Sequence, residues 1–133
     1  MELQNRKILL IEDFSELREF FQRMLSKAGM DVVAVPTGYD GVEYFSHHRE
    51  EIHLVITDLN LPGMDGFEVL ERIRRIHWEV PVIALSAYAD HAAFTQNGYM
   101  EQFDAVLSKP VDIAILQSTI HMVAEKKDIA SIQ

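Results

Sequence analysis

Short apolar runs alternate along the chain with longer segments of helical periodicity. Five of these runs are continuously apolar and rich in β-branched residues, and we expect them to be strands: Lys7–Ile11, Asp31–Val35, His53–Thr57, Pro81–Leu85 and Asp104–Ser108. Unbroken apolar runs of this length are typical of strands that are covered on both faces, as in a parallel sheet.

The segments between the strands carry apolar residues three and four positions apart, which predicts a helix after each strand. The first helix is expected to have Phe14 and Phe21 on its inward face and to stop at Gly29. The third is expected over Gly66–His77. The fourth, over Asp90–Gln102, has the weakest pattern, because an Asn-Gly pair interrupts it.

A strand and a helix repeated five times predict an α/β fold, in which right-handed crossovers place helices on both faces of a doubly wound parallel sheet. The 133 residues suit one domain, 1–133, with a core over about residues 6–125 and short polar tails.

Composition narrows the functional classes. A formal net charge of −9 argues against direct binding to nucleic acid. No apolar run is long enough to insert into a membrane, and the absence of cysteine suits a reducing compartment, so a cytoplasmic protein is expected.

Polar residues follow the expected strands at the sheet edge where ligands of open α/β folds bind. They are Glu12, Asp13, Asp58, Asn60, Ser86 and Lys109. Three carboxylates at one edge repel each other unless a cation lies among them, and oxygen ligands suit Mg²⁺. An aspartate beside Mg²⁺ and a lysine is a plausible nucleophile toward a phosphoryl group.

Each of these residues also has an ordinary structural interpretation. Asp13 could cap the first helix in a capping box with Glu16, and Asp58 could merely end a strand. Ser86 could bond to backbone, and Lys109 could be a solvated loop lysine. Their joint occurrence at the ends of several strands favours a functional site.

Four motifs in order, "LLIED", "VITDLNLPGMDGFE", "VIALSAYA" and "VLSKP", resemble the receiver domain of two-component response regulators, the CheY-like superfamily. The resemblance implies a flavodoxin-like fold with strand order 2-1-3-4-5 and five helices. It also implies a phosphoacceptor switch that takes phosphate from a histidine kinase or histidine phosphotransfer protein. Such a domain is no enzyme in the usual sense, because it catalyses only its own phosphorylation and autodephosphorylation.

The same resemblance implies a role for each residue of the site. Asp58 would be the phosphoacceptor, with Lys109 pairing with the phosphoryl oxygens and the Ser86 hydroxyl turning toward them. Mg²⁺, with Mn²⁺ as a substitute, would be bound by Asp13, Asp58, the backbone carbonyl of Asn60 and, through water, Glu12. The peptide bond before Pro110 would be cis.

The sequence departs from the family where receivers commonly carry Tyr or Phe and this chain has Val106. Phe103 has the opposite strand parity and is not expected to substitute. We therefore expect the phosphorylation chemistry to be retained and the output surface to be specialised. Tyr88, two residues after Ser86, is expected to tune the phosphate lifetime.

Two other functions remain open at this point. The chain could be a pseudo-receiver, an interaction module that never takes phosphate, for which Val106 is the argument. It could also be a Mg²⁺-dependent phosphatase similar to the haloacid dehalogenase family, although Asn60 stands where that family has a second aspartate. The sequence leaves the oligomeric state open, as a monomer or a weak dimer.

Overall fold

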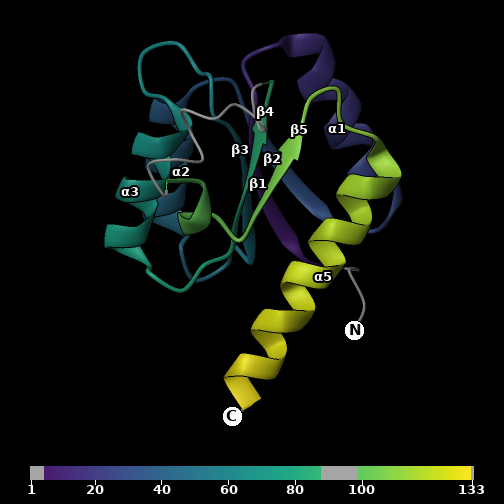
Figure 1. The fold of residues 1–133 in the computed structure, drawn as a ribbon, viewed down its shortest axis with the longest axis vertical. Coiled ribbons are helices and arrows are strands. Elements are labelled where there is room, and N and C mark those ends of the chain that lie inside the picture. The colour runs from purple at the N-terminus through teal and green to yellow at the C-terminus, as the bar shows by residue number, and fades with distance from the viewer. Residues whose placement is uncertain (1–4, 88–98, 133) are drawn as a thin grey trace.

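The computed structural model describes residues 5–87 and 99–132 (Figure 1). Its elements follow in the order β1 (Lys7–Ile11), α1 (Ser15–Lys27), β2 (Asp31–Val35), α2 (Gly38–His48), β3 (Leu54–Asp58), α3 (Gly66–Ile76), β4 (Val82–Ser86), the 3₁₀-helix η1 (Tyr99–Gln102), β5 (Ala105–Ser108) and α5 (Ile113–Ile132).

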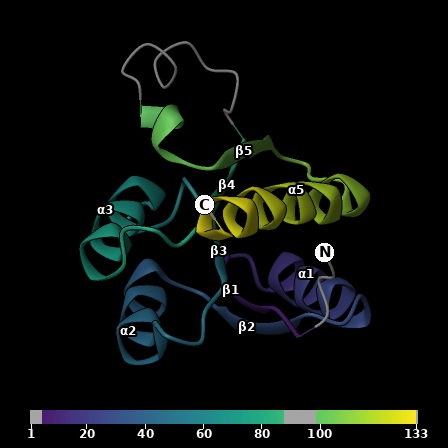
Figure 2. The ribbon, with the colours of Figure 1, turned by 90° about the horizontal axis from the view of Figure 1, so that it is seen from below.

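The five strands form one parallel sheet in the order β2-β1-β3-β4-β5. Helices α2 and α3 cover one face of the sheet, and α1 and α5 cover the other (Figure 2). The predicted flavodoxin-like, doubly wound fold is confirmed.

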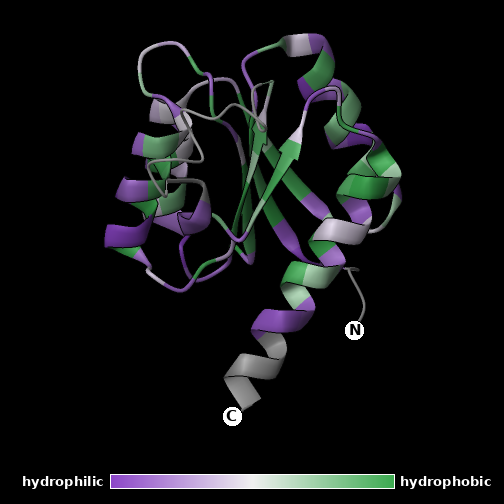
Figure 3. Ribbon diagram, viewed as in Figure 1, coloured by the Kyte–Doolittle hydropathy of each residue, from purple (hydrophilic) through white to green (hydrophobic). Residues whose placement is uncertain are grey.

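Side chains that alternate along each strand divide the core between the two faces. Leu9 and Ile11 of β1 pack in the cluster on the α2 and α3 face, whereas Ile8 and Leu10 pack on the α1 and α5 face. All four are at most 1% exposed. The strands are mostly green, the colour of hydrophobic residues, in Figure 3, as expected for strands that are covered on both faces.

The strand predictions are correct to within one residue: β3, β4 and β5 each begin one residue later than expected. The helix count differs. Most of the predicted helix Asp90–Gln102 lies outside the described residues, and its described end is the short 3₁₀-helix η1. Among residues 5–87 and 99–132 there are thus four α-helices in place of the predicted five.

The prediction that Phe14 faces inward is wrong. Phe14 is the N-cap of α1, its backbone is extended at φ −80° and ψ 113°, and its side chain is 58% exposed. Its amide N–H donates to the Glu12 carboxylate at 3.1 Å. The helical spacing that includes Phe14 fails because the residue lies before the helix begins.

The strand-parity argument about Phe103 is also wrong, whereas the conclusion that Phe103 does not substitute for the missing aromatic stays a prediction. Phe103 precedes β5, so the alternation of that strand does not extend to it. It is 6% exposed and packs in the same core cluster as Val106, with its ring edge-on to Phe67 at 5.6 Å between centroids. An aromatic ring therefore lies on the sheet face that Val106 also occupies.

Within the described part of the chain, no helix has the length and apolar character needed to cross a membrane.

Candidate functional site

The strand register brings the acidic residues together. In the parallel ladder, Ile11 of β1 lies opposite Thr57 of β3, so Glu12 comes next to Asp58. The ladder continues past β1, since the Glu12 amide donates to the Val35 carbonyl at 3.1 Å. The backbone at Glu12 is therefore an extension of the sheet.

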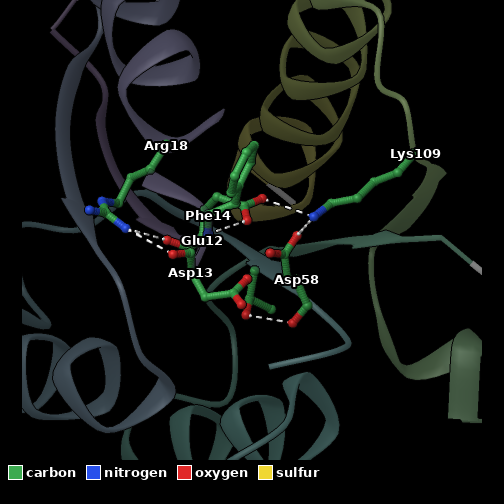
Figure 4. Close-up of polar contacts among 7 residues, drawn as sticks. Glu12, Asp13, Phe14, Arg18, Asp58 and Lys109 are labelled. Atoms are coloured by element: carbon green, nitrogen blue, oxygen red, sulfur yellow. Dashed lines mark hydrogen bonds and ion pairs between the residues drawn. The ribbon is translucent and has the colours of Figure 1, made fainter. Parts of the chain in front are cut away.

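Glu12, Asp13 and Asp58 each offer a carboxylate oxygen, and these atoms lie within 4.8 Å of one another. Lys109 reaches the cluster from the loop after β5, with its Nζ 3.0 Å from Glu12 Oε1 and 2.7 Å from Asp58 Oδ1 (Figure 4). Glu12 is 0% exposed and Asp58 is 1% exposed, whereas Asp13 is exposed. The site is thus a buried pair of carboxylates with one lysine, open to solvent on the Asp13 side.

The backbone places Lys109 as well. Its amide donates to the Ser86 carbonyl at 2.9 Å, which continues the β4–β5 ladder by one bond. The peptide bond between Lys109 and Pro110 is cis. Ser86 is itself buried at the end of β4, one residue beyond the position that pairs with Asp58.

The pKa values of Asp58, Glu12 and Lys109 are shifted in different directions. Burial and the bond shared with Glu12 raise the pKa of Asp58 to about 8, and Lys109 offsets only part of this effect. Burial also raises the pKa of Glu12, but bonds from Asp58, the Phe14 amide and Lys109 outweigh it and leave that pKa lowered. Burial lowers the pKa of Lys109, whereas Asp58 and Glu12 raise it by more. At neutral pH the buried pair of Asp58 and Glu12 therefore favours holding one proton when no metal is bound.

The cluster fits a hard divalent cation. It offers carboxylate oxygens and no nitrogen or sulfur ligand, as Mg²⁺ prefers. Although Asp58 Oδ1 forms an ion pair with Lys109, both buried oxygens of Asp58 lack a hydrogen bond of normal geometry within the described residues. Buried carboxylate oxygens in this state are costly unless a cation or donor reaches them.

The sequence profile of the response regulator receiver domain matches residues 8–121. The chain belongs to this family. Receiver domains bind Mg²⁺ at an acidic pocket, and the acidic cluster of this chain is at the corresponding end of the sheet. Its fold agrees with a receiver domain protein of Clostridium thermocellum, with a TM-score of 0.83, 27% identity and coverage of 94% of this chain and 98% of that one.

The relatives of this receiver are regulators and kinases. It is 38% identical to the transcriptional regulatory protein CseB of Streptomyces coelicolor, over 90% of this chain and 49% of CseB. It is 30% identical to the sensor histidine kinase RcsC of Escherichia coli, over 90% of this chain and 12% of RcsC. The chain thus spans about half the length of its regulator relatives and a small part of the kinase.

The structure excludes the helix-cap interpretation of Asp13. The N-cap of α1 is Phe14, and no side chain caps this helix end. Asp13 lines, together with Asn60, a pocket of about 460 Å³ between the loops that follow β1 and β3. Asp65, in contrast, caps α3, since its side chain accepts from the Glu68 amide at 2.9 Å.

Val106 and Tyr88 are the residues outside the cluster that are expected to tune the switch. Val106 is half-buried on β5, away from the cluster of carboxylates. Tyr88 lies outside the described residues. Their effects on the phosphate lifetime and on the output surface stay predictions.

Arg18 is a residue of this site that the sequence reasoning missed. Its Nη1 donates to the Glu12 carbonyl at 2.9 Å and reaches the Asp13 carbonyl at 3.4 Å. The sequence shows Arg18 only as an arginine five residues after Asp13. An arginine on a helix surface is usually an ordinary solvated residue.

Gly66, the first residue of α3, is packed against the end of β3. A Cβ there would lie 2.7 Å from the Leu59 Cα and would also overlap the Asp58 carbonyl. We expect Gly66→Ala to lower the free energy of unfolding by about 2 kcal/mol, because backbone atoms cannot yield as side chains do. Urea unfolding measures this, with Glu71→Ala on the exposed face of α3 as the control. A loss no larger than that of the control would contradict the expectation.

Proposed function

We propose that this receiver is the phosphoacceptor of a two-component or phosphorelay system, with Asp58 as the residue that takes the phosphoryl group. The phosphate would come from a phosphohistidine on a histidine kinase or a histidine phosphotransfer protein. Transfer to Asp58 would switch an output surface. The relatives support the proposal, since the family occurs both in transcriptional regulators and within a sensor histidine kinase.

One observation carries the proposal: Asp58 is buried at 1% exposure, and its Oδ1 lies 2.7 Å from Lys109 Nζ at the edge of a cluster with two further carboxylates. A residue that only ended a strand would face water. A buried carboxylate beside a lysine is instead a group that enzymes and switches use for covalent chemistry.

The proposed transfer is a displacement at phosphorus. A carboxylate oxygen of Asp58 forms a bond to phosphorus, the bond between phosphorus and the donor imidazole nitrogen breaks, and the imidazole leaves with the electron pair. Lys109 offsets the charge that gathers on the phosphoryl oxygens, and Ser86, at the end of β4, is the proposed hydroxyl donor to one of them. The role of Asp58 as nucleophile requires its ionised form.

Mg²⁺ would be held by Asp13, Asp58 and the backbone carbonyl of Asn60, with Glu12 acting through water; Mn²⁺ is the proposed substitute. When bound, the cation supplies positive charge that stabilises both the ionised carboxylates and the phosphoryl oxygens. The pocket beside Asp13 and Asn60 leaves this side of the cluster accessible.

Incubation of the protein with acetyl phosphate and Mg²⁺, followed by intact mass measurement, tests the proposal. We expect the mass to increase by one phosphoryl group, and the adduct to be lost on standing at alkaline pH. A protein that never gains the adduct would act as a pseudo-receiver, and steady hydrolysis of many phosphate esters would indicate a phosphatase. Apart from Val106, no feature of residues 5–87 and 99–132 favours the pseudo-receiver, and none of them favours the phosphatase.

A further inference from the structure

Arg18 contacts the turn that carries two of the three clustered carboxylates. It lies in α1, half-buried, and its guanidinium reaches back past the start of the helix (Figure 4). There its Nη1 donates to the Glu12 carbonyl at 2.9 Å, and the Asp13 carbonyl lies at 3.4 Å. One side chain thus bonds to the two successive peptide carbonyls of the acidic pair.

This turn lacks the usual support of a helix start. No side chain caps α1, whose N-cap is Phe14. The turn is instead held by the Glu12 carboxylate, which accepts from the Phe14 amide at 3.1 Å, and by Arg18. Besides the backbone bond from the Glu12 amide to the Val35 carbonyl, Arg18 is a side chain outside the cluster that holds this turn.

The two cations of the site act on different atoms. Lys109 forms ion pairs with the carboxylates of Glu12 and Asp58, whereas Arg18, on the opposite side of the cluster, bonds to backbone carbonyls (Figure 4). Bonds to carbonyl oxygens orient the peptide units without occupying the carboxylate oxygens. A guanidinium stays charged at any working pH, so these bonds are charge-assisted throughout.

We propose that Arg18 is a positioning residue that holds the peptide units of Glu12 and Asp13 so that their carboxylates converge with Asp58 on a divalent cation. The inference rests on the cation site of the proposed function, but Mg²⁺ binding can be measured without any phosphorylation. It assigns to Arg18 an effect on cation affinity that its place on a helix surface alone would not predict.

Isothermal titration calorimetry with Mg²⁺ on Arg18→Met, Arg18→Lys and wild type tests the proposal. Arg23→Met is the matched control, because Arg23 is exposed on the same helix and its loss changes the net charge equally. We expect Arg18→Met to raise the Kd for Mg²⁺ about fivefold or more, the typical effect of losing a charge-assisted hydrogen bond. Arg18→Lys should recover part of the affinity, and Arg23→Met should stay within about twofold of wild type.

The other outcomes each overturn the proposal. Tighter Mg²⁺ binding by Arg18→Met would mean that Arg18 acts only through repulsion of the cation. A lowered Tm with an unchanged Kd would mean that Arg18 only stabilises the fold. A wild-type protein that binds no Mg²⁺ would mean that there is no cation affinity for Arg18 to influence. Failure of the proposed function is distinguishable, because a protein that binds Mg²⁺ and gains no phosphate from acetyl phosphate contradicts that proposal alone.

Discussion

Asp58→Asn is expected to abolish the phosphate adduct formed with acetyl phosphate and Mg²⁺. The amide of Asn is a poor nucleophile and carries no negative charge, so it can neither attack phosphorus nor bind the cation as a carboxylate does. Intact mass measurement should therefore show the adduct in wild type and none in the variant. The expected loss is complete, because the proposed transfer uses no nucleophile other than the Asp58 carboxylate.

Asp65→Asn is the matched control for this experiment. Asp65 also follows β3 and lines the pocket beside Asn60, but its side chain caps α3. Asn is an equally good N-cap, so this variant should fold normally and keep the adduct. An adduct that persists in Asp58→Asn, or that disappears in Asp65→Asn alone, would show that Asp58 is not the phosphoacceptor.

Asp58→Asn is also expected to stabilise the metal-free protein at neutral and alkaline pH. The raised pKa of Asp58, about 8 against an ordinary value of 3.8, means that the folded state binds more protons than the unfolded state between these two values. Stability from this group is fully present below the lower value and is lost as pH rises through the upper one. Between about pH 5 and pH 9 the wild type should lose on the order of 3 kcal/mol of unfolding free energy.

The neighbouring groups act outside this window. The lowered pKa of Glu12 gives stability that is present above its ordinary value of 4.5 and is lost as pH falls through the folded value. The raised pKa of Lys109 gives stability that is present below 10.5 and is lost only at higher pH. The loss of unfolding free energy between about pH 5 and pH 9 is therefore assigned to Asp58. The Asp58→Asn variant should show a nearly flat profile of unfolding free energy against pH.

Urea unfolding in the presence of a chelator, followed by circular dichroism at a series of pH values, measures this difference. Fluorescence is unsuitable, because the single tryptophan, Trp78, is already 75% exposed in the folded protein. Addition of Mg²⁺ should remove most of the wild-type decline, since a bound cation favours the ionised carboxylates. Parallel profiles for wild type and variant without metal would contradict the assignment.

Much of the fold could be predicted from the sequence, because local patterns encode it. The strands were predicted to within one residue, since a parallel sheet covered on both faces requires continuous apolar runs. The polar residues that follow those runs were expected to meet, because parallel strands end at the same edge of a sheet. Glu12, Asp13, Asp58 and Lys109 do meet there.

The failures occurred at the ends of helices and strands. Phe14 fitted the helical spacing but lies outside the helix, because the Glu12 carboxylate holds its amide. Phe103 fitted a strand alternation that begins only after it, and its ring is buried against Phe67 of α3. Periodicity describes an element once its ends are known and cannot give the ends themselves.

The amino-acid pattern was enough to specify the order of strands and helices, the edge of the sheet that carries the site, and the residue types present there. The strand register, the insertion of Lys109 between Glu12 and Asp58, and the bonds from Arg18 come from packing between elements far apart in sequence. The same packing removes water from Asp58 and raises its pKa, which no local pattern can encode. Chemistry of this kind depends on distance and burial, and both exist only once the chain has folded.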